Sequence, residues 1–180
     1  MYRPIFLVGF MGSGKSTIGR RLAEHLQLRF IDTDTFIETR FRQRVVDIFA
    51  REGEEVFRRR ERMVMQELMS MSDTIFATGG GLPCHLDMME LLREAGETVY
   101  FRSSAEVLAT RLELCKRTRP TIRDKSGAEL LEFIQHTLGV REPIYLQAHH
   151  VFEVDEIDSA AAETAFARRL AEHPGLLVRE

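Results

Sequence analysis

Residues 9–16 of the chain read GFMGSGKS, and this stretch decides the fold. It fits the pattern GxxxxGK[ST], follows a short apolar run, and precedes a segment with apolar residues at helical spacing. Glycines at these positions let successive backbone N–H groups point at phosphate oxygens, and the following helix adds positive potential at its start. The stretch therefore predicts a phosphate-binding loop at Gly9–Thr17, between a strand and a helix.

Two side chains of this loop have their own predicted tasks. Lys15 places a mobile positive charge near the β- and γ-phosphates of a nucleotide, and the Ser16 hydroxyl suits Mg²⁺. The loop residues predicted to bind ATP are Gly12, Ser13, Gly14, Lys15, Ser16 and Thr17. The motif alone does not separate a GTPase, a motor and a metabolite kinase. The short chain and the missing guanine-reading NKxD pattern favour a metabolite kinase.

The composition is that of one ordinary globular domain. The chain has 180 residues, of which 44% are apolar and 29% charged, and its net charge is −3. This charge does not favour nucleic acid or an anionic membrane as a partner, and no apolar run is long enough to span a bilayer. We expect a single cytoplasmic kinase domain over residues 1–180, monomeric, without a signal peptide and with free thiols at Cys84 and Cys115.

Strand-like and helical segments alternate along the chain, which predicts a parallel sheet with helices on both faces. The predicted strands are Ile5–Val8, Phe30–Ile31, Thr74–Ala77, Thr98–Phe101 and His150–Val154. The predicted helices are Ser16–Leu28, Thr35–Ser70 in two or three pieces, His85–Ala95, Ala105–Leu114, Ser126–Ala148 and Ser159–His173. Ligands bind such sheets outside the carboxyl ends of the strands. The basic segment Cys115–Gly127 breaks the pattern and predicts a mobile lid over about residues 112–126.

Three short motifs bear on the phosphate acceptor. Asp32-Thr33-Asp34 follows the second strand, where one carboxylate can hold the Mg²⁺ hydration shell while the other accepts or orients a hydroxyl proton. Asp34 could instead be only a helix N-cap. Residues 57–61 read FRRRE, and on a helix Glu61 can hold the Arg58 fork ready for a carboxylate. Three glycines at 79–81 leave N–H groups free for a ligand after the third strand.

With these motifs in order, the chain resembles the shikimate kinases over nearly its whole length. The resemblance rests on GFMGSGKST at 9–17, DTD at 32–34, FRRRE at 57–61, GGG at 79–81, Arg119-Pro120 and REPIY at 141–145. It implies an α/β/α P-loop fold like that of nucleoside monophosphate kinases, with a five-stranded parallel sheet in the order 2-3-1-4-5. It also implies that ATP and Mg²⁺ serve to phosphorylate the 3-hydroxyl of shikimate on the route to chorismate.

The resemblance also assigns roles by position. Asp34 is implied as the catalytic base or orienting group, Arg58 and Arg141 as the carboxylate clamp, and Gly80 as a backbone contact to the substrate. Ser16 and Asp32 are implied as the Mg²⁺ site, with the helical segment of about residues 34–61 binding the substrate. Arg119 in the lid is implied to reach the nucleotide phosphates, completing a catalytic set with Lys15 and Asp34.

Some features differ from the family or leave alternatives open. Thr121-Ile122 replaces the usual two leucines after Arg-Pro, Gln147 replaces a usual glutamate, and both Arg111 and Arg117 are candidates to stack on adenine. One alternative is a gluconate-type kinase of the same fold, and the FRRRE, GGG and RxPxY motifs argue against it. The other alternative is a regulatory module without catalysis, and the intact Lys15 and acid pair argue against that. The adjacent residues His149 and His150 do not predict a metal site, because neighbouring strand side chains point to opposite faces.

Overall fold

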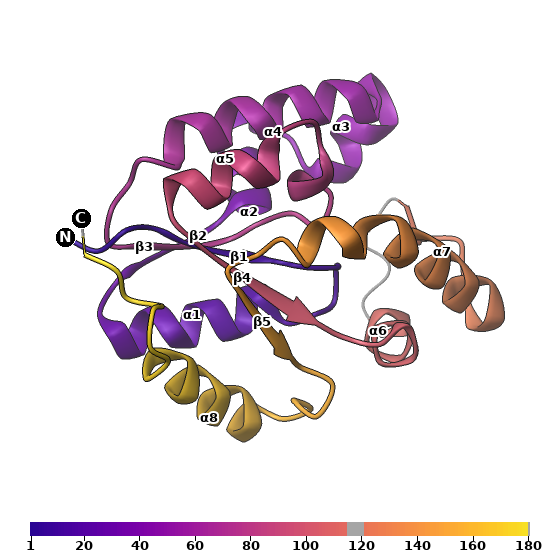
Figure 1. Cartoon of the computed structure of the whole chain (residues 1–180). Helices are drawn as coiled ribbons and strands as arrows, with labels where there is room; N and C mark the ends of the chain where they lie inside the picture. Colours follow the sequence, from indigo (N-terminus) through magenta and orange to yellow (C-terminus); the bar gives the residue numbers. More distant parts are fainter. Residues whose placement is uncertain (115–120, 180) are drawn as a thin grey trace.

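The computed structural model describes residues 1–114 and 121–179. Its centre is a five-stranded parallel sheet in the order β2-β3-β1-β4-β5, as expected (Figure 1). The strands are β1 Ile5–Val8, β2 Arg29–Asp32, β3 Thr74–Ala77, β4 Glu97–Arg102 and β5 His150–Glu153. The helices are α1 Lys15–Leu26, α2 Thr33–Phe41, α3 Val45–Glu52, α4 Glu54–Leu68, α5 Met88–Ala95, α6 Ala105–Glu113, α7 Gly127–Tyr145 and α8 Ala160–Ala171, with a 3-10 turn η1 at Leu82–Cys84.

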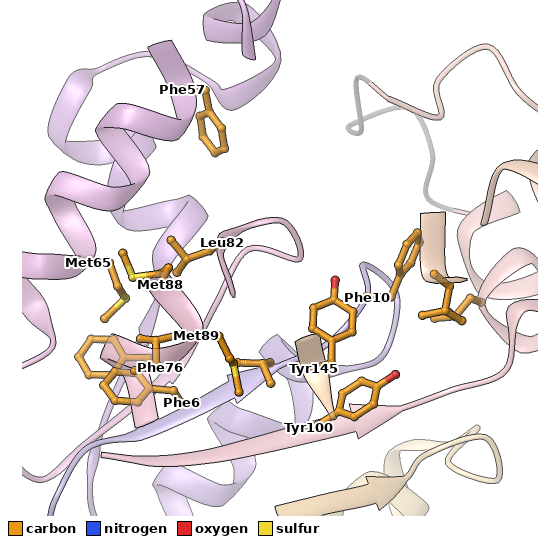
Figure 2. Packing of buried hydrophobic residues seen from close by; sticks show 14 of the residues in the cluster. Phe6, Phe10, Phe57, Met65, Phe76, Leu82, Met88, Met89, Tyr100 and Tyr145 are labelled. Atoms are coloured by element: carbon orange, nitrogen blue, oxygen red, sulfur yellow. The ribbon is translucent and has the colours of Figure 1, made fainter. Parts of the chain in front are cut away.

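The two faces of the sheet carry separate apolar cores, because side chains alternate along each strand. Ile5 and Leu7 of β1 face the core formed with α1 and α8, whereas Phe6 and Val8 face the core formed with α4, α5 and α7. In the second core the rings of Phe6 and Phe76 stack at 5.2 Å, with methionines of α4 and α5 beside them (Figure 2). The predicted three-layer α/β/α arrangement is confirmed.

Most predicted elements appear within two residues of their expected bounds. The long segment after the second strand is three helices, because Arg42 and Gly53 adopt positive φ values of 51° and 85° at the breaks. The helix predicted from His85 starts only at Met88. Pro83 lies in a 3-10 turn, and Leu86 has a φ of 55°, so the chain cannot enter the helix earlier.

The carboxyl ends of the strands meet at one edge of the sheet, where the phosphate loop, the DTD motif and the glycine turn all leave it. The two termini lie together at the opposite edge (Figure 1), where Tyr2 and Arg179 form an isolated bridge. His150 also belongs to that opposite edge, at the start of β5. None of the helices in the described part of the chain has the length and hydropathy of a membrane span.

Candidate active site

Three adjoining cavities follow the carboxyl edge of the sheet. A cavity of about 580 Å³ lies between the phosphate loop, α6 and the segment after β5. A second, of about 240 Å³, lies over the loop itself and contacts both Asp32 and Asp34. A third, of about 260 Å³, lies between α2, α3, α4 and the glycine turn. The second cavity shares Arg111 with the first and Asp34 with the third, so the three form one row in which a nucleotide can meet an acceptor.

The phosphate loop has the backbone form that the motif predicts. Gly12 and Gly14 have φ values of 85° and 90°, a region that is strained for residues with a side chain. Gly14 is the N-cap of α1, so the first N–H groups of that helix open towards the second cavity. Lys15 is only 7% exposed, and its Nζ donates hydrogen bonds of 2.8 Å to the carbonyl oxygens of Gly9 and Phe10. The loop therefore holds its lysine against its own backbone.

Ser16 and Asp32 form the candidate metal site. The Ser16 hydroxyl donates to Asp32 Oδ2 at 2.5 Å, which places two hard oxygen ligands together beside the phosphate loop. This donor set fits Mg²⁺, which prefers a few protein oxygens completed by water and phosphate oxygens. Asp32 is also the N-cap of α2, because its Oδ1 accepts from Thr35 N at 3.1 Å. The capping role considered for Asp34 therefore belongs to Asp32, and Asp34 lies inside the first turn of α2.

The third cavity brings together the residues predicted to bind the acceptor. Asp34, Arg58, Gly80 and Arg141 all line it, although they come from α2, α4, the glycine turn and α7. Phe49 and Phe57, whose rings pack at 4.8 Å, form an apolar wall of the same cavity. Two cations, a carboxylate and an apolar wall suit a compact ligand that has one carboxylate, hydroxyl groups and a hydrocarbon ring.

Arg58 is held in place by its own helix. Its Nη1 donates to Glu61 Oε2 at 2.6 Å and its Nη2 to Glu54 Oε1 at 3.1 Å, so the predicted pairing of Arg58 with Glu61 is confirmed. The guanidinium lies so close to Gly81 that a Cβ at that position would be 2.2 Å from Nη2. A side chain at position 81 would therefore displace the guanidinium from this place.

Glu61 is a buried acid with a strongly raised pKa in this cavity. Its side chain is 1% exposed, and burial raises its pKa to about 7. The positive charge of Arg58 lowers this pKa, whereas the negative charge of the nearby Asp34 raises it further. Its Oε1 is buried and has no hydrogen-bond partner among the described residues. Glu61 therefore both orients Arg58 and carries a protonation that changes near neutral pH.

Thr33, which sequence reasoning did not single out, supports the glycine turn. It is buried between the two acids of the DTD motif, and its hydroxyl accepts from Gly79 N at 3.1 Å and bonds Ala77 O at 3.3 Å. This contact joins residues 46 positions apart in the chain, so nothing in the local pattern could predict it. The middle residue of the motif thus links the start of α2 to the turn after β3.

Arg111 and Asp155 shape the wide first cavity. Arg111 Nη2 donates to the carbonyl oxygens of Val154 and Ile157, both at 2.8 Å, and so orders the segment after β5. Asp155 accepts from Ser103 Oγ at 2.5 Å and from Ser104 N at 3.0 Å, and these bonds lower its pKa against the effect of burial. Arg111 thus lines the cavity expected to hold the base of the nucleotide. The other candidate, Arg117, and the predicted lid residue Arg119 lie outside the described residues.

Comparisons with known proteins agree with this geometry. The family model described as shikimate kinase matches residues 11–171. A shikimate kinase of Parabacteroides distasonis is 46% identical over 155 residues, covering 86% of this chain and 90% of the relative. The crystal structure of a shikimate kinase from Bacteroides thetaiotaomicron superposes with a TM-score of 0.90 at 38% identity, covering 96% of this chain and 98% of that one. The structure of the Acinetobacter baumannii shikimate kinase in complex with shikimate gives 0.85 at 33% identity, covering 94% and 91%. The chain belongs to the shikimate kinase family.

Proposed function

We propose that this protein transfers the γ-phosphoryl group of ATP to the 3-hydroxyl of shikimate and releases ADP. The observation that carries the proposal is the junction of the second and third cavities, where Asp34 and Gly80 line both. An acceptor hydroxyl at this junction would face the phosphate loop on one side and a carboxylate on the other. Family membership and the solved complex of a relative with shikimate support the same acceptor.

The carboxylate of shikimate pairs in this proposal with Arg58 and Arg141. The two guanidiniums come from different helices, α4 and α7, and both line the acceptor cavity. The pairing of Arg58 with Glu54 and Glu61 restricts its orientation before the substrate arrives, so less conformational entropy is lost on binding. The apolar ring of the substrate then lies against Phe49 and Phe57, and the turn at Gly80 offers backbone N–H groups to the hydroxyls.

Phosphoryl transfer requires in-line attack and stabilisation of charge on the γ-phosphate. The 3-hydroxyl oxygen forms a bond to the γ-phosphorus while the bond from that phosphorus to the bridging oxygen of ADP breaks, and Asp34 orients the hydroxyl and accepts its proton. Lys15 leaves the carbonyls of Gly9 and Phe10 and binds the β- and γ-phosphate oxygens. Arg119 would add positive charge from the lid when the lid closes.

Mg²⁺ belongs to the same proposal, and Ser16 and Asp32 would hold it beside the phosphate loop. When bound, it neutralises charge on the phosphate oxygens. The hydrogen bond between the two side chains keeps their oxygens together on the phosphate side of the loop. A cytoplasmic monomer that binds ATP and shikimate, without nucleic acid or membrane partners, remains our expectation from length and charge.

The test is release of ADP by the purified protein with Mg²⁺ and ATP, using shikimate, gluconate and AMP as parallel acceptors. We expect strong acceleration by shikimate alone. Asp34→Asn should still bind both substrates in calorimetry while turnover falls by at least about a hundredfold. Acceleration by gluconate and not by shikimate would show that the third cavity takes the alternative acceptor. Undiminished turnover by Asp34→Asn would remove Asp34 from its proposed role.

A further inference from the structure

Tyr145, the last residue of α7, is joined to the glycine turn. Its side chain is fully buried, and its hydroxyl donates to the carbonyl oxygen of Gly80 at 2.5 Å, between residues 65 positions apart. Its ring packs on the ring of Tyr100 from β4 at 5.2 Å between centroids. Figure 2 shows the two rings next to each other with their hydroxyls pointing in different directions. The hydroxyl of Tyr145 therefore contacts the glycine turn, whereas its ring packs in the apolar core.

This hydrogen bond restrains a peptide group in the glycine turn, which lines the acceptor cavity. The carbonyl of Gly80 and the N–H of Gly81 belong to one planar trans peptide, so they point in opposite directions. A hydroxyl that holds the carbonyl on one side therefore directs the N–H of Gly81 to the other side. In residues 1–114 and 121–179, the N–H groups of Gly80 and Gly81 donate to no recorded protein acceptor, and both residues line the acceptor cavity.

Three consecutive glycines need such restraints more than other residues do, because their backbone dihedrals are the least confined. The first residue of the turn is held by Thr33, which accepts from Gly79 N at 3.1 Å. Gly80 lies against the phosphate loop so closely that a Cβ there would be 3.2 Å from Met11 N. The contact of Tyr145 with the carbonyl of Gly80 restrains the second peptide of the turn, which the contact of Thr33 does not reach.

Tyr145 also stands one helical turn after Arg141, on the same face of α7. Burial strongly raises the pKa of Tyr145, and the positive charge of Arg141 opposes that shift. One helix therefore carries both the clamp for a carboxylate and the tether of the turn. The hydrogen bond from Tyr145 to Gly80 links these two parts of the cavity.

We propose that Tyr145 is a positioning residue for the acceptor: by holding the carbonyl of Gly80, it keeps the Gly80–Gly81 peptide directed at the substrate and the turn in register with Arg141. This inference rests on the proposed function, because the substrate it concerns is shikimate. It places the effect of the hydroxyl on acceptor binding and not on the chemistry of phosphoryl transfer.

The test is Tyr145→Phe, which removes one oxygen and keeps the ring. We expect the KM and the dissociation constant for shikimate to rise about tenfold, because the carbonyl of Gly80 loses its partner and the turn its restraint. The kcat and the KM for ATP should stay within about twofold of the wild type. In a calorimetric titration, unfolded protein lowers the apparent stoichiometry and leaves the dissociation constant unchanged. A partly unfolded sample can therefore be told apart from a loss of affinity.

Tyr100→Phe is the matched control. The Tyr100 hydroxyl contacts Glu142 Oε1 at 3.3 Å and not the turn, so its removal disturbs the same buried ring pair without touching Gly80. We expect an unchanged KM for shikimate in this variant, whatever its loss of thermal stability. An equal rise in both variants, or a loss of kcat without a change in KM in Tyr145→Phe, would overturn the inference.

Two outcomes distinguish a failure of the proposed function from a failure of the inference about Tyr145. A wild-type protein that shikimate does not accelerate would overturn the proposed function, and the inference with it. An active wild type and a Tyr145→Phe variant with the same KM for shikimate would overturn the inference alone.

Discussion

The phosphate loop and the acceptor cavity differ in how their polar groups are paired inside the protein. In the loop, Lys15 bonds two carbonyls of its own segment, and Ser16 bonds Asp32. In the acceptor cavity, Glu61 Oε1 is buried without a hydrogen-bond partner among the described residues, and the N–H groups of Gly80 and Gly81, which line the cavity, donate to no acceptor within the same residues. Lys15 and Ser16 must therefore exchange internal hydrogen bonds when the nucleotide binds, whereas Glu61 Oε1 and the N–H groups of the turn can add contacts without breaking any.

The two regions should therefore affect different kinetic constants. The side chains of the loop can exchange hydrogen-bond partners and stabilise the charge that develops during phosphoryl transfer. Changes to these side chains should therefore affect kcat. The acceptor cavity is held by contacts between α4, α7 and the glycine turn, which affect affinity and KM. The variants below separate the two regions by the kinetic constant that changes.

The largest effect should come from Lys15→Ala. It removes the only side-chain cation of the phosphate loop, and we expect kcat to fall about a thousandfold while the KM for shikimate stays within a few-fold. Steady-state kinetics at saturating Mg²⁺ and ATP measures both constants, and circular dichroism checks the fold. If the KM for shikimate rose as steeply as kcat fell, the two regions would not be separable.

Arg58→Ala and Arg141→Ala should come next. Each removes one charged fork from the acceptor cavity, so we expect the KM for shikimate to rise about a hundredfold and the KM for ATP to change little. Arg62→Ala is the matched control, because Arg62 lies on the same helix as Arg58 and pairs with Asp87 away from the cavity. A similar KM for shikimate in all three variants would contradict the clamp.

The buried acid predicts a pH dependence of stability. The pKa of Glu61 in the folded protein is raised from its ordinary value of 4.5 to about 7, so the stability that Glu61 contributes is fully present below the unfolded pKa and is lost as pH rises through 7. We expect the free energy of unfolding to fall by on the order of 2 kcal/mol between about pH 5 and 8, and Glu61→Gln to flatten this slope.

His149 acts in the opposite direction at lower pH. Burial lowers its pKa, so its protonation destabilises the fold as pH falls below the unfolded value. Because wild type and Glu61→Gln share this histidine, the difference between their denaturation profiles isolates Glu61. Parallel profiles across the range would mean that Glu61 ionises as an ordinary exposed acid.

The smallest effect should come from Arg111→Lys. A lysine keeps the charge but cannot span the carbonyls of Val154 and Ile157 with the same nitrogen geometry, so the segment after β5 loses order. We expect a KM for ATP about three- to fivefold higher and an unchanged KM for shikimate. A change in the shikimate constant would show that the nucleotide cavity and the acceptor cavity are coupled through more than the loop.

The sequence predicted those parts of the molecule that local patterns determine. The strands Ile5–Val8 and Thr74–Ala77 have the expected bounds, because each is a buried apolar run that ends at a glycine or a polar turn. The pairing of Arg58 with Glu61 followed from helical spacing alone. The start of α5 was predicted too early, because the apolar pattern continues through Pro83 and Leu86 while the backbone does not become helical there.

The parts that were not predicted are contacts between distant segments. The bonds of Tyr145 with Gly80 and of Thr33 with Gly79 form only after the sheet has brought three carboxyl ends together. The same holds for Arg111, whose partners lie 43 to 46 residues away. The residues with proposed chemical roles were predicted from the sequence, whereas the residues that hold them in place could be identified only in the fold.

The central claim is that the acceptor is recognised through a carboxylate held by Arg58 and Arg141. The most direct measurement compares shikimate with its methyl ester as acceptors for the wild type, since the ester keeps every hydroxyl and the ring but loses the negative charge. We predict that kcat/KM for the ester is lower by at least about a hundredfold and that Arg58→Ala reduces this preference. Equal kcat/KM for the acid and the ester would contradict the account.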